Sequence, residues 1–502
     1  MSAFDAVVIG AGSNGLVAAA RLAKSGRKVL LLERAQAVGG KSRALAFAPG
    51  FSAAPLGLDP GWLPADIASA LGLTGLARVH PQASLTVVEG PGAAMPVLRE
   101  AIASRSPADG ARWEAFTDSV RNLAGFLAEL YRAPAPDVDV AGLSDLLPLL
   151  SLGRKFRALG KQDMVAFLRT LPMSVQELLD DHFTCGALKA AVATTGVLDF
   201  RQGPRSGGTG FVFLHHLVGA PRGALRGRGS WSGGPEAFAT AALEAVQRSG
   251  ATVRTGAEVT RIEVRDDAVA AVVLENGEEI PARTVLSTAD PVTTFLKWVD
   301  PMWLDPEFVR AIGNVRHRGC TSFVLYGLEA LPDLPGLDGV VSLTPDLVTL
   351  ERAADAAKYG RVPERPHVEL TAPAGKPVLV ARVQYTPYTL REGGAWDDAR
   401  RQALADTVTA MIEAVAPGFR ARVRHRATLS PVDLEREFAL VEGSPSQGEL
   451  GLDQVLFMRP VAGWGRYATP IDGLYLGGSG THPGPGILGG AGWLAAGRML
   501  SA

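Results

Sequence analysis

Three glycines and one acid near the N-terminus have the residue types and the spacing of a dinucleotide-binding turn. Gly10, Gly12 and Gly15 form a G-x-G-x-x-G pattern. In such a turn the first glycine permits a tight bend, the second lets a pyrophosphate approach the backbone, and the third lets a helix pack closely on a strand. Glu33 follows Gly15 by 18 positions and can accept hydrogen bonds from ribose hydroxyls. These residues predict an adenine dinucleotide site; in a chain with 58 glycines, the alternative is a coincidental turn.

A strand, a helix and a second strand must hold these residues in place. The short apolar run 5–9 precedes the glycines, the Ala- and Leu-rich stretch 16–25 follows them, and 28–33 is a second apolar run. Gly26 ends the helical stretch. The free N–H groups at the start of the helix would face a phosphate. The segment therefore predicts a βαβ unit.

The rest of the chain alternates between helical and extended segments. Helices are expected over 111–132, 164–179 and 397–415, with a connecting loop over 133–148. Strands are expected over 323–328 and 377–385, and in a small antiparallel meander formed by 252–254, 258–264 and 268–274 with a turn at Asn276–Gly277. From residue 474 the pattern is strand, glycine-rich turn and helix. This order predicts an α/β protein in which an α+β substrate domain (81–219 and 296–424) is inserted into a discontinuous cofactor domain (1–80, 220–295 and 425–502).

The composition limits which binding partners and which cellular compartment are expected. With 50 Lys plus Arg against 51 Asp plus Glu, the net charge of −1 gives no reason to expect nucleic acid. The two cysteines, Cys185 and Cys320, form no C-x-x-C pair, so we expect neither a redox dithiol nor a cysteine metal site. With so few cysteines, we expect the protein to work in a reducing compartment. Without a signal-peptide pattern or an apolar run of about 18 residues, we expect a cytoplasmic protein.

Three further segments contain motifs that add to the glycine turn. The first is Glu33-Arg34 followed by Val38-Gly39-Gly40-Lys41-Ser42. The second is the glycine-rich run 472–492, which precedes a helical tail. The third consists of three separate stretches: Arg205-Ser-Gly-Gly-Thr-Gly210, the run 450–454 and the pair Arg459-Pro460. Together these segments resemble the amine oxidase and phytoene desaturase superfamily, in its phytoene dehydrogenase-related branch with the carotenoid isomerases. A plain pair of loop glycines is the alternative interpretation of Gly39 and Gly40.

The resemblance implies FAD as the cofactor, and so a Rossmann-type FAD-binding domain. No cysteine lies in 472–492, so the flavin is expected to be non-covalent. In this superfamily the strand that begins at Val259 presents backbone to adenine, and the helix after the C-terminal loop places its N-terminus near the flavin, where it would stabilise negative charge on the reduced ring. The resemblance thus implies as cofactor-binding residues Gly10, Gly12, Ser13, Gly15, Glu33, Arg34, Gly40, Lys41, Ser42, Val259, Gly478, Ser479, Gly486, Ile487 and Leu488.

The catalytic residues are not identified by the sequence. His215 and His216 are more readily read as structural histidines near the domain junction than as catalytic ones. His482 lies inside the C-terminal loop, where positioning the cofactor and transferring a proton are equally good interpretations. No second G-x-G-x-x-G follows a strand, so a separate NADPH site is not expected.

The reaction implied by the resemblance is desaturation of a small apolar substrate by hydride transfer to flavin N5, with oxygen or a quinone as the electron acceptor. Oxidation of an amine or an alcohol is the alternative, and a redox-neutral isomerisation is another.

The run 143–152 is apolar and is followed by Arg154, Lys155, Arg157 and Lys161. This pattern suggests a peripheral membrane contact, with a lid over the substrate channel or plain core as the alternatives.

Overall fold

Five short strands from distant parts of the chain form one parallel sheet. In the computed structural model, which describes residues 4–73, 75–136, 143–225, 229–344, 346–391 and 394–502, the strand order is β19-β13-β1-β2-β9. The strands are β1 (Ala6–Ile9), β2 (Val29–Leu32), β9 (Thr252–Arg254), β13 (Val285–Ser287) and β19 (Leu474–Leu476). Because every neighbouring pair is parallel, all the carboxyl ends meet at one edge, where open α/β sheets bind ligands.

Alternating side chains of this sheet face two different layers. Val8 and Leu31 pack against the helices α1 (Ser13–Lys24), α10 (Ala237–Arg248) and α17 (Gly490–Ser501). Val7 and Leu32 pack on the opposite face, against a three-stranded antiparallel sheet of β10 (Val259–Arg265), β11 (Ala268–Leu274) and β12 (Glu279–Pro281). A strand with both faces covered needs a continuous apolar run, which explains the composition of β1 and β2.

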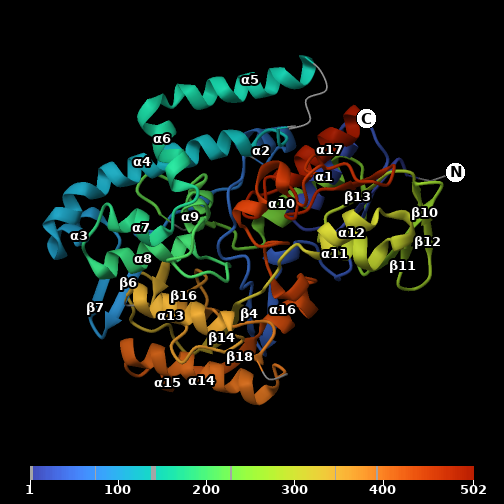
Figure 1. Ribbon diagram of the computed structural model, residues 1–502. Helices are drawn as coiled ribbons and strands as arrows, with labels where there is room; N and C mark the ends of the chain where they lie inside the picture. The colour runs from blue at the N-terminus through green and yellow to red at the C-terminus, as the bar shows by residue number, and fades with distance from the viewer. Residues whose placement is uncertain (1–3, 74, 137–142, 226–228, 345, 392–393) are drawn as a thin grey trace.

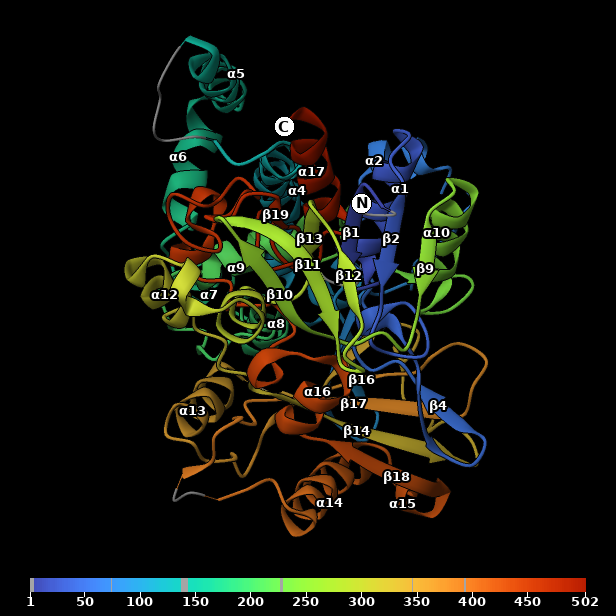
Figure 2. The ribbon, with the colours of Figure 1, turned by 90° about the vertical axis from the view of Figure 1, so that its right-hand side faces the viewer.

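A second, seven-stranded sheet lies below the first (Figure 2). Its order is β18-β14-β17-β16-β15-β6-β7, with β18 (Val423–Leu429), β14 (Thr321–Leu328), β17 (Val378–Gln384), β16 (His367–Thr371), β15 (Val340–Ser342), β6 (Leu85–Gly90) and β7 (Ala93–Pro96). Helix α14 (Asp398–Val415) covers one face. The other face packs against the hairpin β3 (Leu45–Ala48) and β4 (Phe51–Ala53) and against α16 (Pro431–Phe438), which places it next to the cofactor domain.

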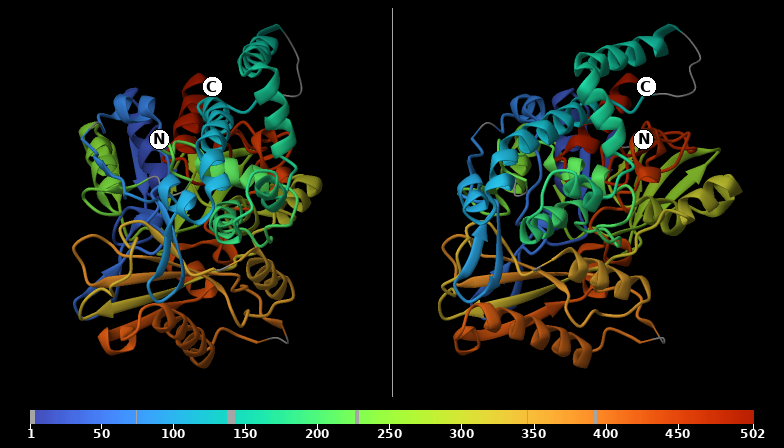
Figure 3. Two further views of the ribbon diagram at one scale, coloured as in Figure 1. Left: turned by 90° about the vertical axis from the view of Figure 1, so that its left-hand side faces the viewer. Right: turned by 60° about the vertical axis from the view of Figure 1, so that its left-hand side comes forward.

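Helices make up most of the remaining structure (Figures 1 and 3). One cluster packs beside β6: α3 (Arg99–Arg105), α4 (Pro107–Tyr131), α5 (Leu143–Ala158), α6 (Gly160–Thr170), α7 (Val175–Asp180), α8 (Gly186–Gly196), α9 (Thr209–Leu217) and α13 (Leu347–Lys358). Smaller elements are α2 (Ala65–Leu71), α11 (Pro291–Thr293), α12 (Pro306–Gly313), α15 (Phe419–Arg422) and the two-stranded pair β5 (Arg78–Val79) and β8 (Ser230–Trp231). None of the helices in the described residues combines the length and the apolar character needed to cross a bilayer.

The α/β fold class and the N-terminal βαβ unit are confirmed, whereas four local expectations are wrong. The strand at 252–254 is not part of the meander, because it pairs with β2 in the parallel sheet. The helix expected over 164–179 is two helices, since the chain leaves α6 at Leu171, just before Pro172, and a capping box at Ser174 starts α7. Helix α5 begins at Leu143, inside the expected loop 133–148.

The fourth difference concerns the cofactor domain. Residues 425–429 were expected in that domain, but they belong to β18, which pairs with β14 in the seven-stranded sheet. The other domain boundaries stay a prediction.

Candidate cofactor site

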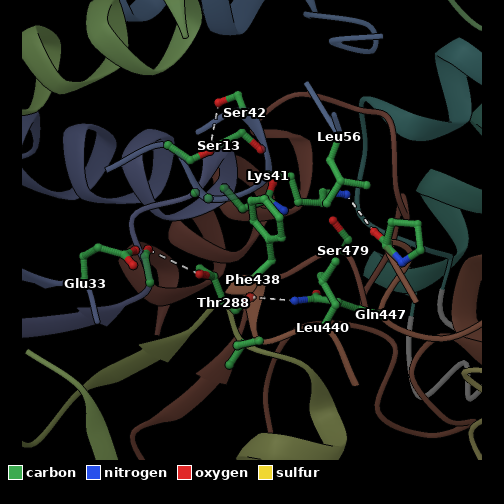
Figure 4. A pocket seen from close by; sticks show the side chains of 18 of the residues that line it. Ser13, Glu33, Lys41, Ser42, Leu56, Thr288, Phe438, Leu440, Gln447 and Ser479 are labelled. Carbon is green, nitrogen blue, oxygen red and sulfur yellow. Dashed lines mark hydrogen bonds between the residues drawn. The ribbon is translucent and has the colours of Figure 1, made fainter. Parts of the chain in front are cut away.

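A cavity of about 640 Å³ opens at the carboxyl edge of the parallel sheet. Its lining includes Gly10 after β1, Glu33 after β2, Thr288 after β13 and Ser479 after β19. The volume falls within the range of roughly 300–1,000 Å³ that is usual for small-molecule and cofactor sites. Figure 4 shows Glu33 at one side of the cavity and Leu56 and Ser479 at the other, as a long ligand would require.

The glycine turn has the shape that a pyrophosphate needs. Gly10 has φ +94°, a conformation that side chains disfavour, and a Cβ on Gly15 would lie 1.7 Å from the carbonyl oxygen of Gly10. By contrast, a Cβ on Gly12 would meet only the Cα of Gly40, at an ordinary contact distance of 3.9 Å, and Gly12 lines the cavity. Helix α1 starts directly after this glycine, and no side chain caps its first turn. Its free N–H groups are therefore available to an anion.

Glu33 holds the turn and keeps acceptor capacity for a ligand. One carboxylate oxygen accepts a hydrogen bond from the N–H of Ala11 at 2.7 Å, and the other accepts one from the N–H of Ala35 at 2.9 Å. The side chain is buried at the cavity wall. A carboxylate offers about four acceptor positions, so two remain for hydroxyl groups. The chemistry fits the ribose of an adenine dinucleotide.

Thr288 and Gln447 join three loops around the cavity. The Thr288 hydroxyl donates to the carbonyl of Ile9 at 2.8 Å. The Gln447 side-chain amide donates to the Thr288 carbonyl at 3.1 Å and accepts from the N–H of Gly480 at 2.9 Å (Figure 4). The two residues thus tie the β1 turn and the end of β13 to the C-terminal loop.

The buried side chain of Arg459 holds the C-terminal loop through hydrogen bonds to backbone carbonyls. Its guanidinium donates to the carbonyls of Ser479 at 2.9 Å, Ser446 at 2.6 Å, Gly448 at 3.2 Å and Gln447 at 3.3 Å. The side chain is 1% exposed, and burial lowers its pKa to about 10, so it stays a cation at neutral pH. Two of the bound residues, Gln447 and Ser479, line the cavity. Arg459 therefore sets the shape of the cavity without lining it.

The three histidines considered in the sequence analysis make structural contacts. His215 is fully buried; one ring nitrogen bonds the Tyr131 hydroxyl at 2.8 Å and the other bonds the carbonyl of Pro485 at 2.9 Å. His216, beside it, packs its ring on that of His215. Neither lines the cavity, which favours the structural reading of both. His482 uses Nε2 to bond the carbonyls of Leu130 and Ala133, so it anchors the loop to the end of α4.

The buried His482 predicts an acid-sensitive stability. Burial lowers the pKa of His482 to about 4, whereas the imidazole titrates near 6.5 when unfolded. Between these values the unfolded chain binds the extra proton, so stability should fall as the pH falls from about 6.5 to about 4, by up to about 3 kcal/mol. We expect His482→Gln to lose this part of the pH dependence, measured by denaturant unfolding at several pH values. His425→Gln, at an exposed histidine, is the control; an unchanged pH slope in His482→Gln would contradict the prediction.

One part of the cavity wall is apolar. Leu56, Phe438 and Leu440 line it and also belong to the cluster that packs on the inner face of the seven-stranded sheet. Lys41 projects into this part and donates to the carbonyl of Pro445 at 2.7 Å (Figure 4). Burial lowers the pKa of Lys41 from its ordinary value. The segment 439–447 includes Ala439, with φ +53°, a strained conformation of the kind found at ligand sites.

Most of the residues implied by the resemblance come together around this cavity. Those that line it are Gly10, Gly12, Ser13, Glu33, Arg34, Gly40, Lys41, Ser42, Val259, Ser479, Gly486, Ile487 and Leu488. Gly15 and Gly478 do not line it. Gly15 lies against the Gly10 carbonyl, and a Cβ on Gly478 would lie 2.5 Å from the carbonyl oxygen of Thr288, so both act through close packing. Direct contact of each lining residue with the cofactor stays a prediction.

The lining residues that were not identified from the sequence include Leu56, Thr288, Phe438, Leu440 and Gln447. Thr288 follows a buried strand, and polar residues after parallel strands are a detectable signal. The other four lie in segments that no local pattern marks.

Comparison with known proteins agrees with this site. The family described as flavin containing amine oxidoreductase matches residues 15–500. A rat protein called pyridine nucleotide-disulfide oxidoreductase domain-containing protein 2 is 32% identical, over 98% of this chain and 92% of its own. Hydroxyneurosporene desaturase of Rhodobacter capsulatus is 26% identical, over 96% of this chain and 94% of its own. The structure of putrescine oxidase bound to putrescine covers 99% of both chains at a TM-score of 0.59 and 15% identity, which shows a shared fold.

The family match spans nearly the whole chain, and the rat relative is similar over 92% of its length. Both agree with a cavity built from a glycine turn, a ribose-binding acid and a C-terminal loop. The chain therefore belongs to the flavin containing amine oxidoreductase family, and its cofactor is FAD.

Proposed function

We propose that this protein is an FAD-dependent dehydrogenase that removes hydride from a C–H bond of an apolar substrate, which leaves a double bond. FAD supplies the hydride acceptor, an atom that no side chain can replace. Ser13, the first turn of α1 and Glu33 would hold its adenosine diphosphate part. Lys41, Gln447 and Ser479, which lie away from Glu33 in the cavity (Figure 4), would hold its ring end together with Gly57 and Ile487, which also line the cavity.

The observation that carries this proposal is the apolar wall of Leu56, Phe438 and Leu440. An apolar ligand gains free energy in proportion to the surface it buries, roughly 25 cal/mol per Å². The wall packs against Phe323 and Leu325 on the inner face of the seven-stranded sheet, so it lies where the cofactor domain meets the substrate domain. A similarity to a desaturase over nearly the whole chain supports the same reading.

Lys41 is a basic side chain beside this wall. Its Nζ donates to the Pro445 carbonyl, and its lowered pKa means that Nζ gives up its proton more readily than an ordinary lysine does, so that a neutral amine can act as a proton acceptor there. We propose that Lys41 Nζ, directly or through a water, takes the proton that leaves the substrate as the double bond forms. The electrons would then pass to an external acceptor, oxygen or a quinone.

Amine oxidation is a second candidate, and it rests on Asp59. This carboxylate lines the cavity next to Gly57 and Pro60 and is exposed toward it. It accepts one hydrogen bond, from the N–H of Gly61 at 3.1 Å, which leaves acceptor positions for a substrate ammonium. The family's name points the same way.

Anaerobic mixing of the FAD-loaded protein separates the candidates. One panel contains long-chain apolar alkenes and the other contains primary and secondary amines. We expect loss of the oxidised-flavin absorbance with members of the alkene panel and formation of a new conjugated double bond. Bleaching by amines alone would replace this proposal with amine oxidation. A double-bond shift that needs reduced flavin and no acceptor would make the protein an isomerase.

A variant of the apolar wall tests the proposal independently. Phe438→Ser removes a half-buried ring from the wall, and we expect kcat/KM for an apolar substrate to fall about tenfold, since a buried aromatic side chain is worth roughly 1.5–3 kcal/mol. FAD affinity should stay unchanged. Phe47→Ser is the matched control, because Phe47 packs in the same cluster but does not line the cavity. Equal losses in the two variants would show that the wall acts on folding and not on the substrate.

A further inference from the structure

We propose that the exposed side of helices α5 and α6 docks on an anionic lipid membrane. The docking patch is defined as Leu150, Arg154, Arg157, Lys161, Val165 and Leu168. Figures 1 and 2 show both helices at one edge of the molecule, with α5 standing clear of the two sheets. The side chains of 143–148 lie outside the described part of the chain, and the patch uses none of them.

In the part of α5 whose side chains the structure describes, 149–158, the helix packs on the protein through one side. Leu152, Phe156 and Leu159 face the helical cluster, and the ring of Phe156 lies 5.4 Å from that of Phe126 on α4. On its other side, Leu150, Arg154 and Arg157 are exposed at spacing i, i+4 and i+7, so they share one face. Leu150 is 65% exposed.

Helix α6 repeats this arrangement. Phe167 is buried against Phe126 and Phe156. Lys161, Val165 and Leu168 form a second exposed stripe with the same i, i+4, i+7 spacing, and the two apolar members are each 58% exposed. Three of the eight large apolar side chains that are exposed in the described chain therefore lie in the docking patch.

The charges of the two helices favour an anionic partner. Between 149 and 170 the chain has five basic residues and one acidic residue. Lys155 pairs with Glu129 and Arg169 pairs with Asp181, both within the protein. Arg154, Arg157 and Lys161 have no carboxylate within 4.0 Å in the part of the chain that the structure describes. Among the described residues of the two helices, the cations without a carboxylate partner are thus those that share a stripe with the exposed apolar side chains.

A lipid surface suits this combination better than a folded partner. Three separated apolar side chains are too few for the buried core of a stable protein interface, which involves about 20–30 residues a side. Apolar side chains can enter the headgroup boundary one by one, while neighbouring Lys and Arg bind lipid phosphates and carboxylates. This inference is independent of the reaction proposed above, although it would place the enzyme where apolar substrates accumulate.

Vesicle flotation with the FAD-loaded full chain tests the inference. The probes are vesicles of phosphatidylcholine alone and vesicles of phosphatidylcholine with phosphatidylserine. We expect binding to the anionic vesicles, little binding to the neutral ones, and weaker binding as salt is raised, because exposed charges are screened. Failure of the folded protein to bind anionic vesicles would overturn the inference.

Two variants locate the contact. One triple variant reverses the charges of the patch: Arg154→Glu/Arg157→Glu/Lys161→Glu. The other removes its apolar side chains: Leu150→Ser/Val165→Ser/Leu168→Ser. Each variant should weaken vesicle binding at least tenfold. The matched controls change exposed residues elsewhere: Arg27→Glu/Arg265→Glu/Lys376→Glu and Met302→Ser/Val348→Ser. Flavin content and circular dichroism verify the fold. If the patch variants bind as the wild type does, or the controls lose binding equally, the patch is not the contact.

Discussion

Gly15→Ala is expected to abolish FAD binding. The new methyl group would lie 1.7 Å from the Gly10 carbonyl oxygen and 2.9 Å from its carbonyl carbon, and both are backbone atoms that no rotamer change can move. Helix α1 must then shift away from the turn that follows β1. The N–H groups of its first turn would leave the position that a pyrophosphate occupies, and these groups are the main anion-binding feature of the cavity.

The measurement is the flavin content of the purified protein, followed by titration of the apoprotein with FAD. Gly125→Ala is the matched control: a Cβ there meets nothing within 4 Å, and alanine is the better helix former in the middle of α4. Wild-type FAD affinity in a folded Gly15→Ala protein would show that the helix tolerates the shift and that this turn does not hold the pyrophosphate.

The sequence predicts well where structure is local. The βαβ unit spans about thirty consecutive residues, and its strands and helix differ in period and in composition, so β1, α1 and β2 could be located together with the glycines and Glu33. The break between α6 and α7 was also visible in principle. Pro172 and the Ser174–Glu177 capping box are local signals, and they outweigh the apolar periodicity that suggested one helix.

Pairing between distant strands could not be predicted in the same way. The strand 252–254 was identified as a strand, but its partner, β2, lies more than two hundred residues earlier, and nothing in three residues distinguishes a parallel edge strand from part of a meander. The same limit applies to residues 425–429, which pair with β14. Register and partner are set by tertiary packing, which period-2 alternation does not encode.

The residues of the candidate site differ in the same way: some have a local sequence signal and others depend on contacts between distant segments. Residues that bind through backbone shape have a glycine signature, so Gly10, Gly12 and Gly40 were found. Gln447 acts through a side chain that reaches Thr288 and Gly480 from a remote segment, and Leu440 is an ordinary core leucine until the seven-stranded sheet places it at the cavity. Their roles arise from positions in space and have no local pattern.

Arg459→Met is expected to lower the free energy of unfolding by at least about 3 kcal/mol and to weaken FAD binding with it. Methionine fills much of the volume but donates no hydrogen bond, so the carbonyls of Ser446, Gln447, Gly448 and Ser479 would lose their donor in a buried place. An unsatisfied buried acceptor costs about 1–3 kcal/mol, and several are created at once. The loss of FAD affinity follows because Gln447 and Ser479 line the cavity.

Denaturant unfolding of the apoprotein and FAD titration measure the two effects separately. Arg265→Met, at an exposed arginine, is the control and should change the free energy of unfolding by no more than about 0.5 kcal/mol. Arg459→Lys keeps the charge but has three donors on a single nitrogen, which cannot span carbonyls on both sides of the guanidinium, so we expect an intermediate loss. If Arg459→Met unfolds at the wild-type midpoint, the carbonyls have found other donors, and the C-terminal loop keeps its shape without the arginine.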